Sequence, residues 1–515
     1  MVEQITYKNI DPKVRSMIMA GLVFAMLCAC FDGTIVGTCG TIIAQDLDGL
    51  GLYAWMTTAY MLCETVMIPI SGKLSDLYGR KHLFLIGLGI FVGGSVVAGM
   101  SSSMEMLIAC RAFQGIGGGI LIPVATAAVA DLYAPHERAR MQGLLGAVFG
   151  IGSGIGPLLG GFITDNISWH WVFYINVPLA AIAFFLTIKK FPTPIQDSKP
   201  VVDYIGISVL TLFLLDLVLF FHWAGDEFDW VSLQSAGMVA GAIVLLVVFW
   251  MIEKRAKEPV IAPKVLHNRT VIMAAVFMFL FGLAMMGAMM YSSMFAIFIL
   301  GLSTMEAAEY TIAMIVGMMI TALASGALVE RTGYKPWLVA GPVISFAAMY
   351  MMSKLTLDSD LSYYAVCLFV FGFGLGCMMA IVMTAVQNSS KATEIGMTTS
   401  AVNLIRSIGS TIGTAIFALI INNKIALELK DNVDGYIYDM VPHTTAVLNY
   451  LQSPEFILIA GPQNVRGILL SFANSVDMAF LIGGALILCL TVIGFFFRET
   501  PPKDDVPESD IEKKE

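Results

Sequence analysis

The sequence predicts an all-α integral membrane protein with fourteen transmembrane helices, built as two six-helix bundles plus two inserted central helices. Three observations predict this fold. The chain is 57% hydrophobic and 13% charged, whereas soluble domains carry about 25% charged residues. Apolar runs of about 20 residues, the length that crosses a bilayer, recur from residue 16 to residue 496. Basic residues cluster in alternate loops, and two distant segments share one motif.

The apolar runs follow one another with short polar breaks, except for one long connection near the C-terminus. Threaded with the N-terminus in the cytoplasm, the chain places most of its 29 Lys and Arg residues in cytoplasmic loops, as the positive-inside rule requires. An even number of spans then leaves both termini in the cytoplasm of a multi-pass cell-membrane protein. The predicted spans are 16–43, 53–71, 83–101, 106–130, 140–163, 170–188, 204–222, 234–253, 271–299, 307–329, 337–354, 361–386, 397–421 and 471–496.

The segments that follow the second and tenth spans repeat one another. Residues 72–81 and 326–335 share Gly, Leu, an acid, Gly and Lys in register. Repeated halves are common in membrane proteins whose two bundles move about a site at the membrane midplane. The predicted parts are an N-terminal six-helix bundle (1–190), two inserted transmembrane helices (203–253), a C-terminal six-helix bundle (271–496) and a cytoplasmic tail (497–515).

One connection, residues 422–470, is far longer than the others. It mixes polar and apolar residues and contains Pro442, Pro454 and Pro462. We expect a folded extracellular excursion, a hairpin or short helices, while disorder or a simple insertion is the alternative.

Composition and motifs exclude several classes of protein. The sequence contains no Gly-x4-Gly-Lys-Ser/Thr loop, no HExxH, no CxxC and no nucleophile elbow, so we expect no enzyme, no metal site and no cofactor. The net charge of −9 is spread over loops and the tail, which argues against nucleic acid as a partner. All eight cysteines lie in apolar runs and are interpreted as small packing residues.

Charged side chains inside predicted spans are the first candidates for a functional site, because charge is costly in hydrocarbon. Asp32, Glu64 and Arg111 lie in the first, second and fourth spans. A membrane-depth carboxylate can load a proton on one side and release it on the other, and when ionised it attracts a cation. The alternative is structural: the acids would pair with basic groups, and Arg111 would be a fixed strut between helices.

The loop after the second span carries a compact motif. Gly72 and Gly79 permit tight turns, while Asp76 can cap a helix or pair with a basic neighbour such as Arg138. The segment resembles the loop 2–3 signature of the major facilitator superfamily, where this loop acts as a conformational latch between the halves. A basic loop that only fixes topology is the alternative. The resemblance gives the latch residues as Gly72, Asp76, Gly79, Arg80, Lys81 and Arg138, and the repeat adds Glu330 and Arg331 in the second half.

A glycine-rich stretch in the fifth span, residues 150–161, resembles the antiporter motif of exporters in this superfamily. Small residues allow close helix approach, and a proline interrupts the backbone hydrogen-bond ladder. A glycine-rich packing face without a transport role is the alternative. The motif residues are Gly152, Gly156, Pro157, Gly160 and Gly161.

Three further segments, 31–41, 169–178 and 403–413, resemble the fourteen-helix drug:proton antiporter branch, multidrug exporters of the quaternary-ammonium-compound type. Gly37 and Thr41 stand where that branch normally has Asn and Pro. The resemblance implies the major facilitator fold and, in the thirteenth span, makes Asn403 and Arg406 second-half site residues.

The resemblance implies a secondary active transporter that exports hydrophobic, often cationic small molecules by proton-coupled antiport, a multidrug efflux protein. The expected partners are a small-molecule substrate, protons and the lipid bilayer, and we expect a monomer. A proton-coupled symporter importing a metabolite is one alternative. A non-transporting membrane sensor that uses residues 422–470 as its ligand domain is another.

Overall fold

The computed structural model describes residues 10–49, 52–188, 191, 202–224, 228–261, 268–391, 394–451 and 453–497. Residues 498–515 of the predicted cytoplasmic tail therefore lie outside the described residues. Within them the chain is helical and forms no strand, apart from one isolated bridge between Ala224 and Phe228. The helices are α1 (Pro12–Asp46), α2 (Tyr53–Tyr78), α3 (Arg80–Ala98), α4 (Met104–Leu132), α5 (Arg138–Asn166), α6 (His170–Tyr174), α7 (Asn176–Thr187), α8 (Tyr204–Trp223), α9 (Leu233–Glu253), α10 (Arg269–Phe298), α11 (Thr304–Thr332), α12 (Lys335–Met352), α13 (Leu361–Ser389), α14 (Ile395–Asn432), α15 (Gly435–Met440), α16 (Val447–Tyr450) and α17 (Pro454–Phe496).

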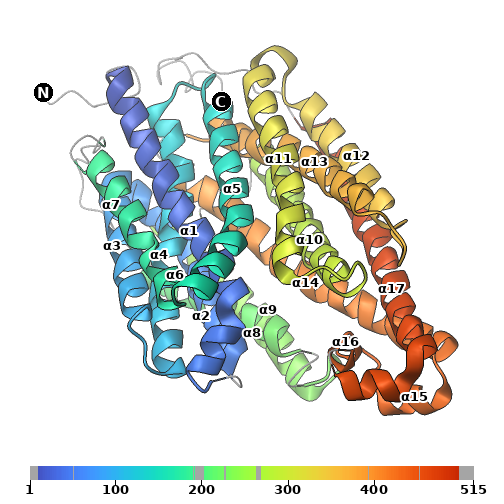
Figure 1. The fold of residues 1–515 in the computed structure, drawn as a ribbon. Helices are drawn as coiled ribbons and strands as arrows, with labels where there is room; N and C mark the ends of the chain where they lie inside the picture. Colours follow the sequence, from blue (N-terminus) through green and yellow to red (C-terminus); the bar gives the residue numbers. More distant parts are fainter. Residues whose placement is uncertain are drawn as a thin grey trace, which may run out of the picture.

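The long helices form two groups that pack side by side, and both chain termini lie at the same end of the molecule (Figure 1). In the first group α1 packs on α5 and α7, and α4 packs on α2 and α3. In the second, α10 packs on α14, α13 packs on α11 and α12, and α17 packs on α12 and α14. The groups meet where α5 contacts α11 and where α2 contacts α14. We call them the first and second halves.

Twelve helices of the described chain are long and apolar enough to cross a membrane, counting α6 and α7 together as His170–Thr187. The sequence prediction of fourteen spans is two higher than this count. The predicted spans 53–71 and 337–354 form α2 and α12, but these two helices are not among the twelve. Their composition explains why: α2 contains Glu64 and Pro69, and the 18-residue α12 begins with Lys335 and contains Pro342.

The hairpin of α8 and α9 lies beside the seam between the halves. Its two helices pack on each other, and α8 also contacts α2 and α14. Leu210 and Leu214 of α8 are buried in one cluster with Val66 of α2 and Leu404 of α14. Lys73 of α2 forms an ion pair of 2.7 Å with Glu258, which follows α9. The hairpin therefore touches both halves along one edge.

Residues 422–470, which we call the cap, fold largely as helix. α14 continues to Asn432, α15 and α16 follow, and α17 already begins at Pro454. Asn464 joins the two sides of this region, because its side chain accepts from the Asp434 backbone N–H at 2.8 Å and donates to the Asp434 carboxylate at 2.9 Å. Gly461 breaks the helical path of α17 with φ of 74°. A disordered connection is excluded for the described part.

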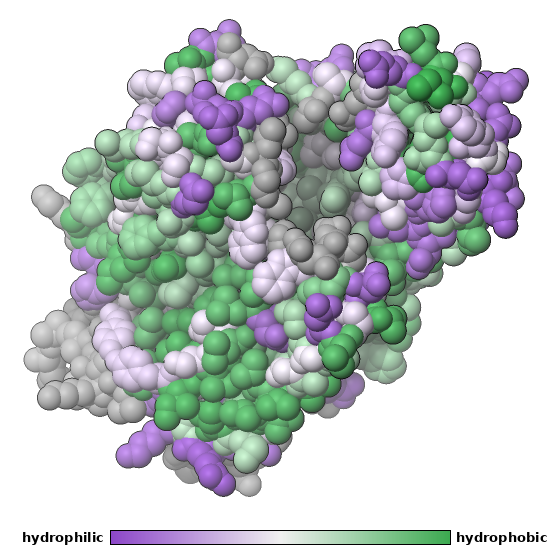
Figure 2. Space-filling model, turned by 90° about the horizontal axis from the view of Figure 1, so that it is seen from below, coloured by the Kyte–Doolittle hydropathy of each residue, from purple (hydrophilic) through white to green (hydrophobic). Residues whose placement is uncertain are grey.

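The two ends of the molecule differ. At the end that carries the termini, which we call the terminal end, the halves are joined by the contacts described below. Figure 2 shows the opposite face, which is hollowed near its upper middle beside a largely hydrophilic block on the right. Figure 1 places α15 and α16 on that side. The halves are thus closed against each other at the terminal end.

Candidate functional site

The first cluster of interest is a buried polar network inside the first half. Asp32 of α1 and Arg111 of α4 are each 1% exposed and form a direct ion pair. Arg111 also donates to Gln114 at 2.8 Å, and Gln114 donates to Asp32 at 2.7 Å and to Ser95 at 3.2 Å. A buried charge pair is tolerated when further hydrogen bonds satisfy it, and here the same helix supplies both donors.

A third donor to Asp32 comes from the start of α7. Asn176, which is fully buried, donates to the Asp32 carboxylate at 3.3 Å and to Ser95 at 3.0 Å. The Arg111 guanidinium also lies 4.2 Å from the centre of the Tyr60 ring. The Asp32 carboxylate is therefore held by side chains of α4 and α7, and its charge is matched by Arg111.

Sequence reasoning selected Asp32 and Arg111 but missed Gln114, Ser95 and Asn176. Gln114 could have been found, because it lies three residues after Arg111 and thus on the same helix face. Ser95 and Asn176 are uncharged residues on other helices, and no spacing rule connects them to Asp32.

Glu64 stands apart from this network. Its side chain is partly buried, and it makes no hydrogen bond or ion pair with any described residue. The charges that act on its carboxylate are those of Arg406 in the second half and of Asp32 and Arg111 in the first. The structure thus brings Glu64 near the predicted coupling residues without a direct bond.

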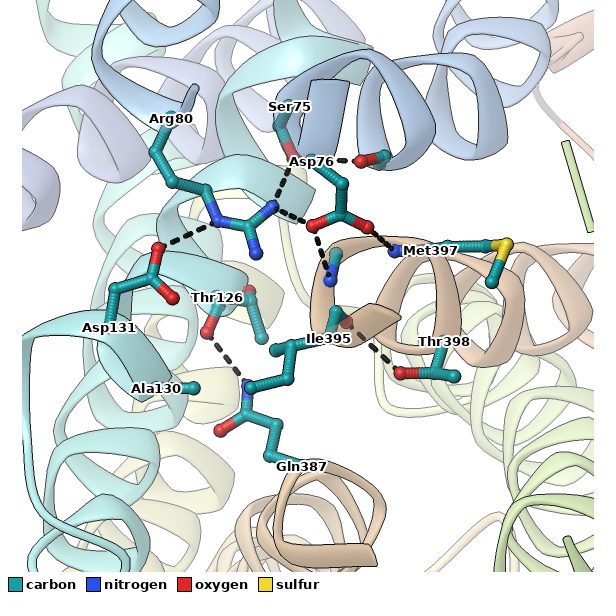
Figure 3. Close-up of polar contacts among 12 residues, drawn as sticks. Ser75, Asp76, Arg80, Thr126, Ala130, Asp131, Gln387, Ile395, Met397 and Thr398 are labelled. Atoms are coloured by element: carbon teal, nitrogen blue, oxygen red, sulfur yellow. Dashed lines mark hydrogen bonds and ion pairs between the residues drawn. The ribbon is translucent and has the colours of Figure 1, made fainter. Parts of the chain in front are cut away.

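The second cluster joins the halves at the terminal end. Asp76 near the end of α2 accepts hydrogen bonds from the backbone N–H groups of Gly396 at 3.0 Å and Met397 at 2.7 Å, in the first turn of α14. A carboxylate at a helix N-terminus is favourable, since the free N–H groups and the helix dipole point toward it. Figure 3 shows the carboxylate between this helix start and Arg80.

Arg80 completes this contact from the side of the first half. Its guanidinium pairs with Asp76 at 2.7 Å and with Asp131 at 3.0 Å, and it bonds to Ser75. Arg80 is only 4% exposed. Its buried positive charge is compensated by the carboxylates of Asp76 and Asp131. Lys81, the next latch residue, is only partly buried.

The backbone of the latch has the geometry that its glycines allow. A Cβ at Gly72 would overlap the Ser400 side chain and the Gly396 carbonyl of α14. Gly79 has φ of 84° and ends α2. In the repeat, a Cβ at Gly326 would overlap the Ala139 carbonyl of α5, and Gly333 has φ of 76°. In each copy of the repeat, the first glycine therefore allows its helix to pack closely on the start of a helix in the other half.

Arg138 and two glutamines form a second set of bonds between the halves. Arg138 at the start of α5 donates to Asn388 of α13 at 3.0 Å and to the Ala130 carbonyl at 3.0 Å. Gln142 donates to Gln387 at 3.2 Å, and both amides donate to the Thr126 carbonyl at 2.9 Å. These bonds close the terminal end beside the latch.

The second-half candidates have different surroundings. Glu330 and Arg331 at the end of α11 are exposed, and no hydrogen bond or ion pair to a described residue is found for either. Asn403 and Arg406 of α14 instead face a narrow cavity between the halves. The structure thus does not bring these four residues together.

Most of the predicted glycines of α5 pack on α1. A Cβ at Gly152 would overlap Cys30 of α1, and a Cβ at Gly156 would overlap Thr34. Gly160 lies against Ile35 and Cys39, whereas Gly161 has open space beside it and makes no close approach. Pro157 lies within the helix. Three of the four predicted glycines therefore form the face that contacts α1.

Comparison with known proteins places this geometry in context. The family model described as Major Facilitator Superfamily matches residues 22–414. The multidrug transporter protein MdtP of Bacillus subtilis is 35% identical over 428 residues, which are 83% of this chain and 79% of that protein. Multidrug resistance protein 3 of the same organism is 34% identical over 81% of this chain and 82% of its own length.

More distant matches agree with these. The efflux pump FUS6 of Gibberella moniliformis is 26% identical, over 95% of this chain and 89% of its own length. Among solved structures, the proton:xylose symporter XylE aligns over 95% of this chain and 97% of its own, with a TM-score of 0.63 and 12% identity. At that identity the likeness shows the fold alone.

Proposed function

The chain belongs to the Major Facilitator Superfamily and is a membrane transporter, not an enzyme; on this premise we propose that it exports hydrophobic, often cationic small molecules in exchange for protons. The names of its relatives, multidrug transporter protein and efflux pump, support export of drug-like molecules. The observation that carries proton coupling is the buried ion pair of Asp32 and Arg111, to which the side-chain amides of Gln114 and Asn176 are bonded.

In this proposal Asp32 carries the proton. The ionised carboxylate is matched by Arg111, so adding a proton leaves the guanidinium as an unmatched charge at 1% exposure. An unmatched buried charge is strongly unfavourable, and rearrangement of α1 against α4 would relieve it. Protonation on the outer side would then drive the change that releases substrate, and proton loss on the inner side would reset the site.

We assign the terminal end to the cytoplasm, because the Lys and Arg residues of the sequence favour that side. The contacts of Asp76, Arg80 and Arg138 then hold the cytoplasmic end closed, and the hollow of Figure 2 faces outward. Transport requires these contacts to break and re-form in each cycle. This is the latch role we propose for them, with the glycine face of α5 as the surface against which α1 moves.

Finer assignments belong to the same proposal. We propose that α2 and α12 also cross the bilayer, which gives fourteen spans and places the protein in the drug:proton antiporter branch. The division into bundles at 1–190 and 271–496, the inserted pair at 203–253, and a monomer in the cell membrane with cytoplasmic termini are part of it. Reporter fusions after residues 101 and 358 would test the two added spans by their side of the membrane.

The test uses inverted membrane vesicles, in which an exporter loads substrate inward. We expect a proton gradient to drive uptake of a lipophilic cation dye, and substrate addition to dissipate the gradient. Asp32→Asn should abolish the gradient dependence while the protein remains folded and in the membrane. Normal gradient-driven uptake by that variant would refute the role of Asp32, and movement of dye and proton in the same direction would favour the symporter.

A further inference from the structure

Two buried side-chain nitrogen donors in α14 have no acceptor among the described residues. They are the Asn403 side-chain amide nitrogen and the Arg406 Nε atom, neither of which has a hydrogen-bond partner in the part of the chain that the structure describes. Asn403 is only 4% exposed. Buried polar groups in folded proteins nearly always have a partner, and an unpaired one calls for a water, an ion or a ligand.

Both side chains line one cavity between the halves. Its other walls include Met26 of α1, Phe149 of α5 and Met383 of α13, so the surface is mostly apolar. Gln142, part of the closed end, also lines it. The present cavity of about 20 Å³ holds a water molecule but not a drug-sized ligand. Because its walls come from both halves, it would widen when the halves separate.

The charges around this cavity point to the chemistry of a ligand. The Arg406 guanidinium has no ion pair or hydrogen bond with any described residue, and the acid that acts on it, Glu64, does not contact it. Asp32, by contrast, is already matched by Arg111, Gln114 and Asn176. The free groups that face the cavity are therefore donors.

We propose that Asn403 and Arg406 form a subsite for an anionic or carbonyl oxygen of the transported molecule, so that the protein prefers amphoteric aromatic molecules over purely cationic ones of the same shape. This inference rests on the proposed transport function. The aromatic body packs on Phe149 and on the methionines that line the cavity. Methionine side chains are flexible and polarizable, so they adapt to ligands of different shape. The oxygen is held by the planar donors of Arg406 and by the Asn403 amide.

Two dyes that differ in one group provide the test. Rhodamine 19 is a zwitterion with a free carboxylate, and rhodamine 6G is its cationic ethyl ester. We would measure binding of each dye to the purified full-length protein in nanodiscs by fluorescence anisotropy. The wild-type protein should bind rhodamine 19 at least several-fold more tightly. Arg406→Gln and Asn403→Leu should each weaken rhodamine 19 by about tenfold or more and change rhodamine 6G by less than about threefold.

Two controls keep the outcome clear. Asn449→Leu makes the same substitution as Asn403→Leu at an exposed position that does not line the cavity, and it should leave the binding of both dyes unchanged. Arg406→Lys, which keeps the charge but loses the planar fork, should retain part of the preference even if Arg406→Gln does not fold. Equal affinity of the wild-type protein for both dyes, or an equal loss of both in Asn403→Leu, overturns the subsite and indicates a structural or hydrated role.

The binding assay separates this inference from the transport proposal. It requires no proton gradient, so the dye preference and its loss would stand even if Asp32→Asn transported normally. Conversely, gradient-driven export together with identical binding of the two dyes removes only the subsite.

Discussion

Asp76 joins the halves through backbone groups, so its removal tests whether the latch sets the balance between two conformations. The Asp76→Ala change deletes the acceptors for the Gly396 and Met397 N–H groups at 3.0 and 2.7 Å, and it leaves Arg80 without one of its two carboxylates. The bonds to Gly396 and Met397 cross between the halves and exist only while the terminal end is closed, whereas the pair with Arg80 lies within the first half and is lost in both conformations. The change therefore disfavours the closed end relative to the open end.

The size of the effect follows from the bonds. A hydrogen bond to a charged group contributes about 1.5 to 3 kcal/mol, and two bonds to one carboxylate contribute less than twice that. We therefore expect a shift of about 2 to 4 kcal/mol, which is about 30-fold to 800-fold in the equilibrium constant. A conformation with an open terminal end that is present at about 1% would then rise to about a quarter or more.

The assay measures the distance between the halves at that end. Spin labels on unnatural amino acids at His82 and Arg331, both exposed, avoid the native cysteines and report one half each by pulsed electron resonance. Asp76→Ala should add a population at longer distance. Glu105→Gln removes an exposed acid in the first turn of α4, and it should not change the distances. Identical distance distributions in folded Asp76→Ala and wild-type protein would refute the latch reasoning.

Two other predictions concern packing and the cap. Gly156→Ala should lower the melting temperature in detergent, since its Cβ overlaps Thr34 and overpacking costs about 1 to 3 kcal/mol; Gly161→Ala, beside open space, should not, and equal effects of both would contradict the packing face. Asn464→Ala should speed tryptic cleavage at the exposed Lys430, because it removes both bonds to Asp434. Asn449→Ala, an exposed position, is the control, and equal cleavage rates would show that Asn464 does not hold the cap.

The apolar runs of the sequence predicted where the long helices lie. They did not predict the lengths of these helices, and they gave two more membrane spans than the twelve described helices that are long and apolar enough to cross a membrane. Hydropathy is averaged over all sides of a helix, whereas a helix in a membrane bundle directs its charged residues toward the bundle interior. α2 illustrates this, because Glu64 and the latch residues lower its average although the helix packs closely on α4. The extension of α14 to Asn432 could not be predicted from hydropathy either, because its last turns lie beyond the apolar run, where Asn432 donates to Ser471 of α17 at 3.3 Å.

The candidate site was predicted where charge made it visible. A charged residue in an apolar run stands out, so Asp32, Glu64 and Arg111 could be selected without knowing their neighbours. Ser95 and Asn176 could not be selected in this way, because they are small uncharged residues. Only the packing of α3 and α7 brings Asn176 to Asp32 and Ser95 to the amides of Gln114 and Asn176. From the sequence, Asp76 could either cap a helix or form an ion pair with a basic residue. In the structure it does both, because it accepts from the first turn of α14 and pairs with Arg80.

The two copies of the repeat share a backbone geometry and an acid, but only in the first copy does the acid bond to the other half. By the symmetry that relates Gly72 to Gly326, Glu330 should cap α5 as Asp76 caps α14. Yet Glu330 is exposed, and α5 begins with Arg138, which is bonded to Asn388 instead. The closed end is therefore held by an acid on one side and by an arginine and amides on the other. Because the second copy supplies no equivalent carboxylate, it cannot compensate for the loss of Asp76, and the shift estimated for Asp76→Ala should appear undiminished.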